Sequence, residues 1–103
     1  MADIIPYPLT RPKALEIIRE VACISSRQFY TRHAKERMRE RGFSTTDVLD
    51  CLQKGRISEG PFQAANGNWQ FTMVWFRAGS QIQVVAALDT DDEGNYLIII
   101  TTI

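Results

Sequence analysis

The sequence predicts an α+β fold in which three N-terminal helices pack on a C-terminal antiparallel meander of three to four strands. Up to Gly55 the apolar residues recur at the three- and four-residue spacing of helices, whereas after Gly55 they alternate as in strands. Short turn sequences separate the later segments, and short connections join antiparallel neighbours, so we expect the helices on one face of the sheet. We expect the 103 residues to form a single domain, residues 1–103.

Each predicted helix has a candidate N-cap, a residue whose side-chain oxygen can accept from the free backbone N–H groups of the first turn. We expect the second helix over Arg32 to Arg41, and the third begins with Ser-x-x-Asp, a relative of the capping box. A glycine follows the second and third helices, where the periodicity stops. These start and stop residues are Thr10 with Pro12 in the first turn, Thr31 with Gly42, and Ser44 and Asp47 with Gly55.

The second half of the chain contains the expected strands. "RISEGPFQAA" is a weak strand interrupted by Gly60-Pro61, and "WQFTMVWFR" alternates between the turn signals at residues 66–68 and 78–80. The last segment, "YLIIITTI", is almost continuously apolar, as a strand covered on both faces would be. Trp69 and Trp75 share one face of the alternation, where they either fill the space between sheet and helices or stack bases.

Composition argues against several classes of protein. No apolar run has the length of a membrane span and the N-terminal residues lack the pattern of a secretory signal, so we expect a cytoplasmic protein. Cys23 and Cys51 lie in apolar helical patterns and are expected to stay reduced. Two cysteines and one histidine show no metal-ligand spacing. We therefore expect neither a metal nor a cofactor.

The formal net charge is zero, but the charge is unevenly distributed. Residues 1–56 carry eleven Lys and Arg against seven Asp and Glu, whereas residues 57–103 carry one basic residue against five acids. Such asymmetry indicates a side that faces a polyanion. The neutral total points the other way, because dedicated nucleic-acid binders are usually basic.

The stretch "YTRHAKERMRERG" contains the only histidine and five basic residues. On a helix, His33, Arg37 and Arg41 lie at i, i+4 and i+8 and line one stripe. The planar fork of arginine suits phosphate oxygens, and histidine is the natural proton carrier for cleaving an RNA backbone. These three residues are the candidate catalytic set. Further candidate RNA contacts are Arg32, Arg39, Arg77 and Tyr30.

Three other interpretations of this stretch are also consistent with the residues. A helix with this composition can simply be solvated. It can serve as a docking face of a non-catalytic module that binds a protein partner. It can also hold an internal polar network in which His33, Arg37 and Arg41 tie the second helix to the sheet.

At "RHAKERMRERGFSTTDVLDCLQKG" the sequence resembles a family of small bacterial proteins grouped as a domain of unknown function. Their pattern is His-Ala-x-x-Arg-Met-x-x-Arg-Gly followed by a capped helix, a glycine and a strand meander. The resemblance covers roughly residues 29–103. The residues that match it are His33, Ala34, Arg37, Met38, Arg41, Gly42, Asp47 and Val48.

This family is similar to RelE/barnase-like RNase toxins, including the BrnT toxins, and the order of elements resembles that of the motility quorum-sensing regulator toxin. The resemblance implies metal-independent mRNA cleavage, inhibition by a cognate antitoxin and a helices-on-sheet fold. Those toxins carry basic and tyrosine residues on their late strands, whereas here the late segments offer only Tyr96 and Arg77. The first hypothesis is therefore a toxin-type endoribonuclease that depends on His33 and the helix arginines. The alternative is a non-catalytic, toxin-like module that docks a protein on residues 32–41.

Overall fold

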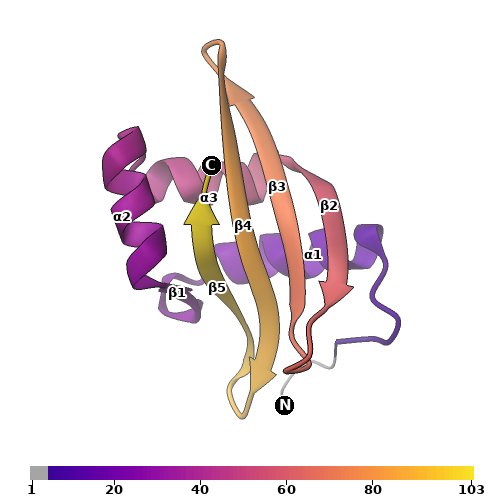
Figure 1. Ribbon diagram of the computed structural model, residues 1–103. Coiled ribbons are helices and arrows are strands. Elements are labelled where there is room, and N and C mark those ends of the chain that lie inside the picture. Colours follow the sequence, from indigo (N-terminus) through magenta and orange to yellow (C-terminus); the bar gives the residue numbers. More distant parts are fainter. Residues whose placement is uncertain (1–4) are drawn as a thin grey trace.

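The structure is a computed structural model that describes residues 5–103. The chain folds as α+β, with three helices preceding a part that consists mostly of strands, as the sequence predicts (Figure 1). Within the described range, no helix combines the length and apolar character that crossing a membrane requires. The elements are α1 (Arg11–Ala22), a short 3-10 turn (Ser25–Arg27), β1 (Gln28–Tyr30), α2 (Arg32–Arg41), α3 (Thr45–Lys54), β2 (Arg56–Gln63), β3 (Trp69–Arg77), β4 (Ser80–Asp91) and β5 (Gly94–Thr102).

The helices begin and end at the signals read from the sequence. Thr31 Oγ1 accepts from the first turn of α2 at 3.0 Å, and Gly42 ends that helix in the left-handed conformation with φ 72°. At α3, Ser44 and Asp47 form a reciprocal capping box with distances of 2.9 and 3.2 Å. Gly55 ends α3 for a different reason, since its φ is ordinary but a Cβ there would clash with a carbonyl of β3.

The sheet has the strand order β1-β5-β4-β3-β2. Strands β2 to β5 form the expected antiparallel meander, with four strands. The additional strand β1 pairs with β5 in parallel and aligns Phe29 with Ile98. This pairing joins segments about seventy positions apart in the chain, so no local pattern announces it.

Two helices cover one face of the sheet, and the third does not. In Figure 1, α1 and α3 cross behind the strands, and their buried apolar residues pack against the alternate residues of β3, β4 and β5. Helix α2 instead lies beside β5, above the short β1, although Ala34 and Met38 still reach the core. The core side chains of the sheet include Phe71, Met73, Val84, Leu88 and Leu97.

The sheet face opposite α1 and α3 carries no second layer of described residues (Figure 1). Strand β5 was expected to be covered on both faces, but Ile98 and Ile100 are only half-buried. The outward-facing residues of β5 instead pack against a side chain of the neighbouring strand β1. Phe29 of β1 aligns with Ile98 and meets the Tyr96 ring edge-on at 5.6 Å. This face therefore keeps an exposed aromatic surface.

Both tryptophans are engaged within the chain. Trp69 is buried and packs against the Tyr7 ring at 5.8 Å. Trp75 is half-buried beneath the Lys54 ammonium, which lies 5.4 Å from the ring centre. Filling the space beside the helices, rather than stacking bases, is the role that these contacts give them.

The two cysteines provide a direct test of the packing. Cys23 is exposed, whereas Cys51 is fully buried on α3 and burial raises the pKa of its thiol to about 12. Because the thiolate is the reactive form, we expect a thiol reagent at about pH 8 to modify the exposed Cys23 quickly. The buried Cys51 should react only after unfolding. The Cys23→Ser variant should lose the fast phase, and rapid modification of both thiols in the folded wild type would contradict this packing.

Candidate nucleic-acid interface

Helix α2 presents its charged residues on two flanks, because Ala34 and Met38 turn one side of it toward the core. Successive residues are rotated by about 100° in a helix, which separates the remaining side chains into two groups on either side of the buried stripe. We call these groups the His33 flank and the Arg39 flank. The His33 flank consists of His33, Arg37 and Arg41, and the Arg39 flank consists of Arg32, Lys35 and Arg39.

On the His33 flank, the three candidate catalytic residues share a stripe but differ in environment. His33 and Arg41 are exposed. Arg37 is half-buried, donating through Nε to the Thr102 carbonyl at the end of β5 at 3.3 Å and pairing with Glu40 at 3.2 Å. Arg37 thus ties α2 to the sheet, as the internal-network interpretation expects of it, while His33 and Arg41 point to solvent.

The Arg39 flank borders a hollow of about 280 Å³ between α2 and the turn into α3. Its apolar lining comes from Tyr30, Met38 and Phe43, and Lys35 and Arg39 contribute the charged part of the wall. Ser44 and Thr45 complete it at the start of α3. The structure therefore brings together two predicted RNA contacts, Tyr30 and Arg39, on the flank away from His33.

Tyr30 is one of the residues that line this hollow. Its hydroxyl is buried and has no hydrogen-bond partner among the described residues. Burial raises the pKa of Tyr30, so the hydroxyl stays protonated at neutral pH. Because the hydroxyl is closed off from solvent, a ligand in the hollow would meet aromatic ring surface and the neighbouring cations, a combination that suits a stacked base.

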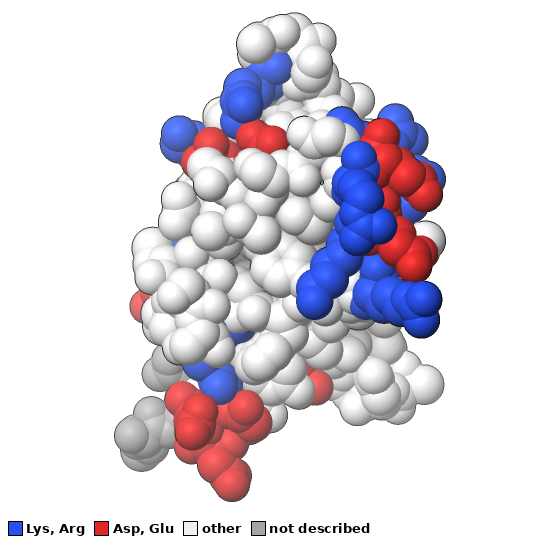
Figure 2. All heavy atoms as spheres, turned by 90° about the vertical axis from the view of Figure 1, so that its left-hand side faces the viewer, with Lys and Arg blue, Asp and Glu red and all other residues white. Residues whose placement is uncertain are grey.

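The charge of α2 is only partly compensated. Arg32 pairs with Glu36 at 3.3 Å, and Arg37 pairs with Glu40. Lys35, Arg39 and Arg41 make no ion pair with any residue in the described range. Figure 2 shows these basic side chains gathered on the α2 side of the molecule, with the acids of the β4–β5 turn at the other end. Three free cations on one helix form a positive surface suited to a polyanion.

Arg77 lies apart from both flanks, at the end of β3. Its guanidinium forms an ion pair with Asp47 and lies 3.8 Å from Asp50, both on α3. The Ser44 N–H and the Arg77 guanidinium hold the pKa of Asp47 below its usual range. The predicted RNA contact Arg77 is therefore already occupied by a carboxylate.

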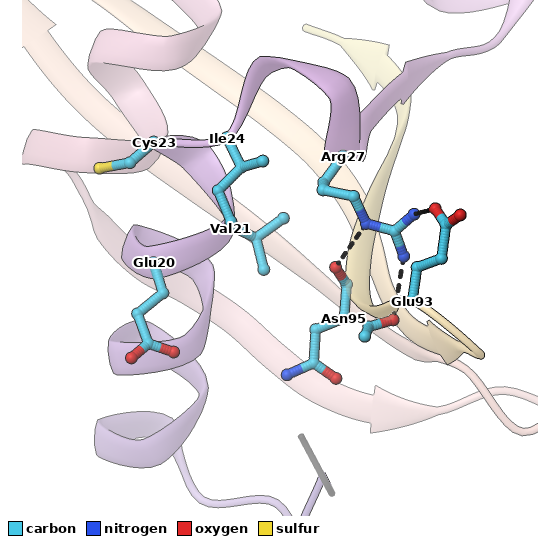
Figure 3. Close-up of a pocket in the computed structure, with 8 residues that line it drawn as sticks. Glu20, Val21, Cys23, Ile24, Arg27, Glu93 and Asn95 are labelled. Atoms are coloured by element: carbon cyan, nitrogen blue, oxygen red, sulfur yellow. Dashed lines mark hydrogen bonds and ion pairs between the residues drawn. The ribbon is translucent and has the colours of Figure 1, made fainter. Parts of the chain in front are cut away.

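A cavity of about 540 Å³ lies between the end of α1 and the β4–β5 turn (Figure 3). The guanidinium of Arg27 faces this cavity but is largely occupied, because it donates to the carbonyls of Gly94 and Asn95 at 3.0 and 3.2 Å. It also pairs with Asp91 at 2.6 Å and Glu93 at 3.3 Å. With four of its five N–H donors engaged, Arg27 pins the acidic turn to the rest of the fold.

The described residues contain no group of three His, Cys, Asp or Glu side chains close enough to hold a metal ion. The expectation that the protein needs no metal and no cofactor stays a prediction.

The fold and surface thus define a class of protein: an α+β domain with a basic helix, only partly compensated by ion pairs, at the edge of its sheet. Residues 30–103 match the family described as Domain of unknown function (DUF4258), so the chain belongs to that family. The matched segment runs from Tyr30 through α2 and α3 to the end of the sheet and leaves α1 outside, as the sequence resemblance suggested. Comparisons with curated proteins and with solved structures gave no match. The resemblance to RNase toxins stays a prediction.

Sequence reasoning did not assign a functional role to Lys35, Phe43 or Arg27. Lys35 lies within the basic stretch, and its i, i+4 spacing to Arg39 places both side chains on one flank. Phe43 follows the helix-ending glycine, a position where an apolar residue often packs back on the last turn. Arg27 gave no signal, because its carboxylate partners are more than sixty positions away.

The tie made by Arg37 can be measured. We expect Arg37→Ala to lower the free energy of unfolding by about 1 kcal/mol, because one charge-assisted hydrogen bond is lost from a side chain that is 31% exposed. Arg41→Ala is the control, with an expected change within about 0.5 kcal/mol. Urea denaturation of both variants would measure this. Equal stability of the two variants would contradict the tie, and a loss of several kcal/mol would indicate a larger buried network.

The Asp47 carboxylate predicts a loss of stability in acid. Its folded-state pKa is lowered, so the ionised form stabilises the fold above the unfolded pKa, and this contribution disappears as the pH falls through the folded pKa. Urea midpoints should therefore decline between about pH 5 and pH 3. Asp47→Asn should show a weaker decline, while the exposed control Asp92→Asn should follow the wild type. Parallel curves for the wild type and Asp47→Asn would contradict this assignment.

Proposed function

We propose that the protein binds single-stranded RNA through the Arg39 flank of α2. The observation that supports this best is the hollow in which the free cations Lys35 and Arg39 adjoin the rings of Tyr30 and Phe43. Proteins that bind single strands combine a cationic path for the phosphates with aromatic surfaces on which bases stack. In this proposal a base enters the hollow and stacks on an aromatic ring there, and the neighbouring phosphates lie against the two cations.

We further propose that the bound strand is mRNA and that the protein cleaves it as a metal-independent endoribonuclease of the toxin–antitoxin type. His33 acts as general base, taking the proton of a ribose 2′-hydroxyl, whose oxygen then attacks the adjacent phosphorus. The bond from phosphorus to the 5′ oxygen breaks, and that oxygen takes a proton from His33 or from water. Arg37 and Arg41, on the same stripe, stabilise the charge that develops on the phosphorane.

The remaining predicted contacts, Arg32 and Arg77, would contribute less to RNA binding. Arg32 and Arg77 are already ion-paired, so either would have to exchange its carboxylate for a phosphate. Such an exchange gives little net energy at an exposed site. A cognate antitoxin would inhibit the protein by placing an acidic segment on α2, where the same free cations would bind it.

The second candidate is a non-catalytic module that binds a protein partner on α2. It is favoured by the position of His33, which is exposed on the flank away from the hollow. A general base usually works within a site that excludes water and converges on the reacting atoms. On this view the basic helix meets an acidic partner surface, and loss of the imidazole changes nothing.

Binding can be tested with a fluorescein-labelled oligouridylate followed by anisotropy over a range of salt concentrations. We expect Lys35→Gln/Arg39→Gln to weaken binding and to reduce the salt slope by about 1.4, because each phosphate contact on a single strand contributes about 0.7. The matched control, Lys13→Gln/Lys54→Gln, removes two paired lysines from α1 and α3 and should bind as the wild type does. Equal affinities for the two double variants would contradict the RNA site on α2.

Cleavage is tested separately, with the same RNA in the presence of EDTA. His33→Ala should reduce the cleavage rate by about 10² to 10⁴ while leaving RNA affinity and the thermal melt unchanged. In a bacterial host, induction of the wild type should arrest growth, and His33→Ala at matched soluble levels should not. RNA binding without cleavage and without growth arrest would contradict the nuclease activity and leave a non-catalytic RNA-binding protein.

A further inference from the structure

One side of the molecule carries three zones in a row. Figures 1 and 2 place the basic helix α2 at one end, the acidic β4–β5 turn at the other and an almost uncharged surface around β1 between them. Helix α2 has five basic and two acidic residues, a net +3. Asp89, Asp91, Asp92 and Glu93 give the turn four negative charges, of which Arg27 compensates one. The two ends thus carry nearly equal and opposite charges.

The middle zone is apolar and hollowed. Phe29 is 48% exposed and stands edge-on to Tyr96, beside the half-buried Ile98. These residues border a hollow of about 410 Å³ that also touches Asp91 of the acidic turn and Thr31 at the start of α2. The apolar zone therefore runs continuously from one charged end to the other. An exposed aromatic cluster with charged rims is typical of a protein interface.

We propose that this face binds a second copy of the chain and forms a two-fold symmetric dimer. In such an interface each copy presents the same patch, so the patch must complement itself. A two-fold axis through the Phe29 zone places α2 of each copy against the acidic turn of the other. The charges then match at both ends, and the two Phe29 zones meet on the axis. This inference does not rest on the proposed RNA function, and the dimer would cover the same cations of α2, so that dimerisation and RNA binding would exclude each other.

The size of the face fits this arrangement only if all three zones take part. A stable interface buries roughly 800 Å² per partner, roughly an eighth of the 5998 Å² surface of this chain. Two aromatic residues and an isoleucine supply only part of that area. The charged ends must supply the rest, which makes the dimer sensitive to salt.

The sheet edges offer less for self-association. Arg11 donates along β2, to the carbonyls of Ile57, Ser58 and Gly60 at 3.4, 3.3 and 2.8 Å, and thereby occupies part of that edge. The edge of β5 beyond β1 is covered by α2. Edge-to-edge pairing of the meander is therefore disfavoured, which favours a contact through the three-zone face.

Sedimentation velocity tests the dimer, at protein concentrations from about 1 to 200 µM, which cover the weak affinities of small interfaces. We expect a dimer in low salt whose dissociation constant rises with ionic strength. Phe29→Ser should raise that constant at least about tenfold. The control Phe76→Ser removes a phenylalanine that is 62% exposed at the far end of β3, outside the face, and should have no effect. A monomer at every concentration, or equal effects of the two variants, would overturn the proposal.

A charge-swap experiment tests the symmetry itself. Asp92→Lys/Glu93→Lys changes the acidic turn, counted with Arg27, from a net −3 to +1, and Lys35→Glu/Arg39→Glu changes α2 from +3 to −1. Each variant alone should be weakened in self-association, because its two ends no longer attract. Their equimolar mixture should restore the dimer, since each variant complements the other at both contacts. Circular dichroism confirms that both variants are folded. A mixture that associates no more tightly than either variant alone would overturn the two-fold arrangement.

Discussion

The position of helix α2 depends on the residue that joins it to the sheet, Thr31. Its backbone N–H donates to the Ile99 carbonyl at 3.1 Å, and its hydroxyl donates to the Ile100 carbonyl at 2.8 Å. The same hydroxyl accepts from the Ala34 N–H at 3.0 Å and caps α2. One side chain thus ends β1, anchors the chain to β5 and starts the helix. Together with the burial of Ala34 and Met38, it fixes how the two flanks of α2 lie against the sheet.

That anchor explains why the basic residues of one helix face different surroundings. With Ala34 and Met38 held in the core, the Arg39 flank must lie over the hollow beside Tyr30. The His33 flank must then follow the end of β5, where Arg37 finds a carbonyl partner. A set of charges that looks uniform in sequence becomes a structural tie on one side and a ligand surface on the other. The proposed RNA site follows from this division.

Much of the fold could be predicted because its signals are local. Caps, a left-handed glycine and alternating strands lie within a few residues of the elements they define, and each was found in its expected place. The contacts that failed to show in the sequence are those between distant segments. Strand β1 pairs with β5 across the chain, Arg77 finds Asp47 thirty positions away, and Arg27 reaches the β4–β5 turn. The two ion pairs neutralise charges that appear free when only the sequence is considered.

The same limit applies to the site. Helical spacing placed His33, Arg37 and Arg41 on one stripe, and that stripe exists. Spacing along one helix carries no information about the other elements around it, so the hollow formed by Tyr30, Phe43 and the start of α3 could not be foreseen. The half-exposed outer face of β5 was missed because an apolar strand that lies beside an aromatic residue of a neighbouring strand resembles one covered on both faces.

The central claim is that α2 and its hollow form the ligand surface of this protein, and amide chemical shifts would test it most directly. A short unlabelled oligouridylate would be titrated into the ¹⁵N-labelled chain, which at 103 residues suits this measurement. The account predicts saturable shifts concentrated at Tyr30, Lys35, Arg39 and Phe43, and at the capped start of α3. Shifts centred on the Arg27 cavity, or no shifts at low salt, would contradict it.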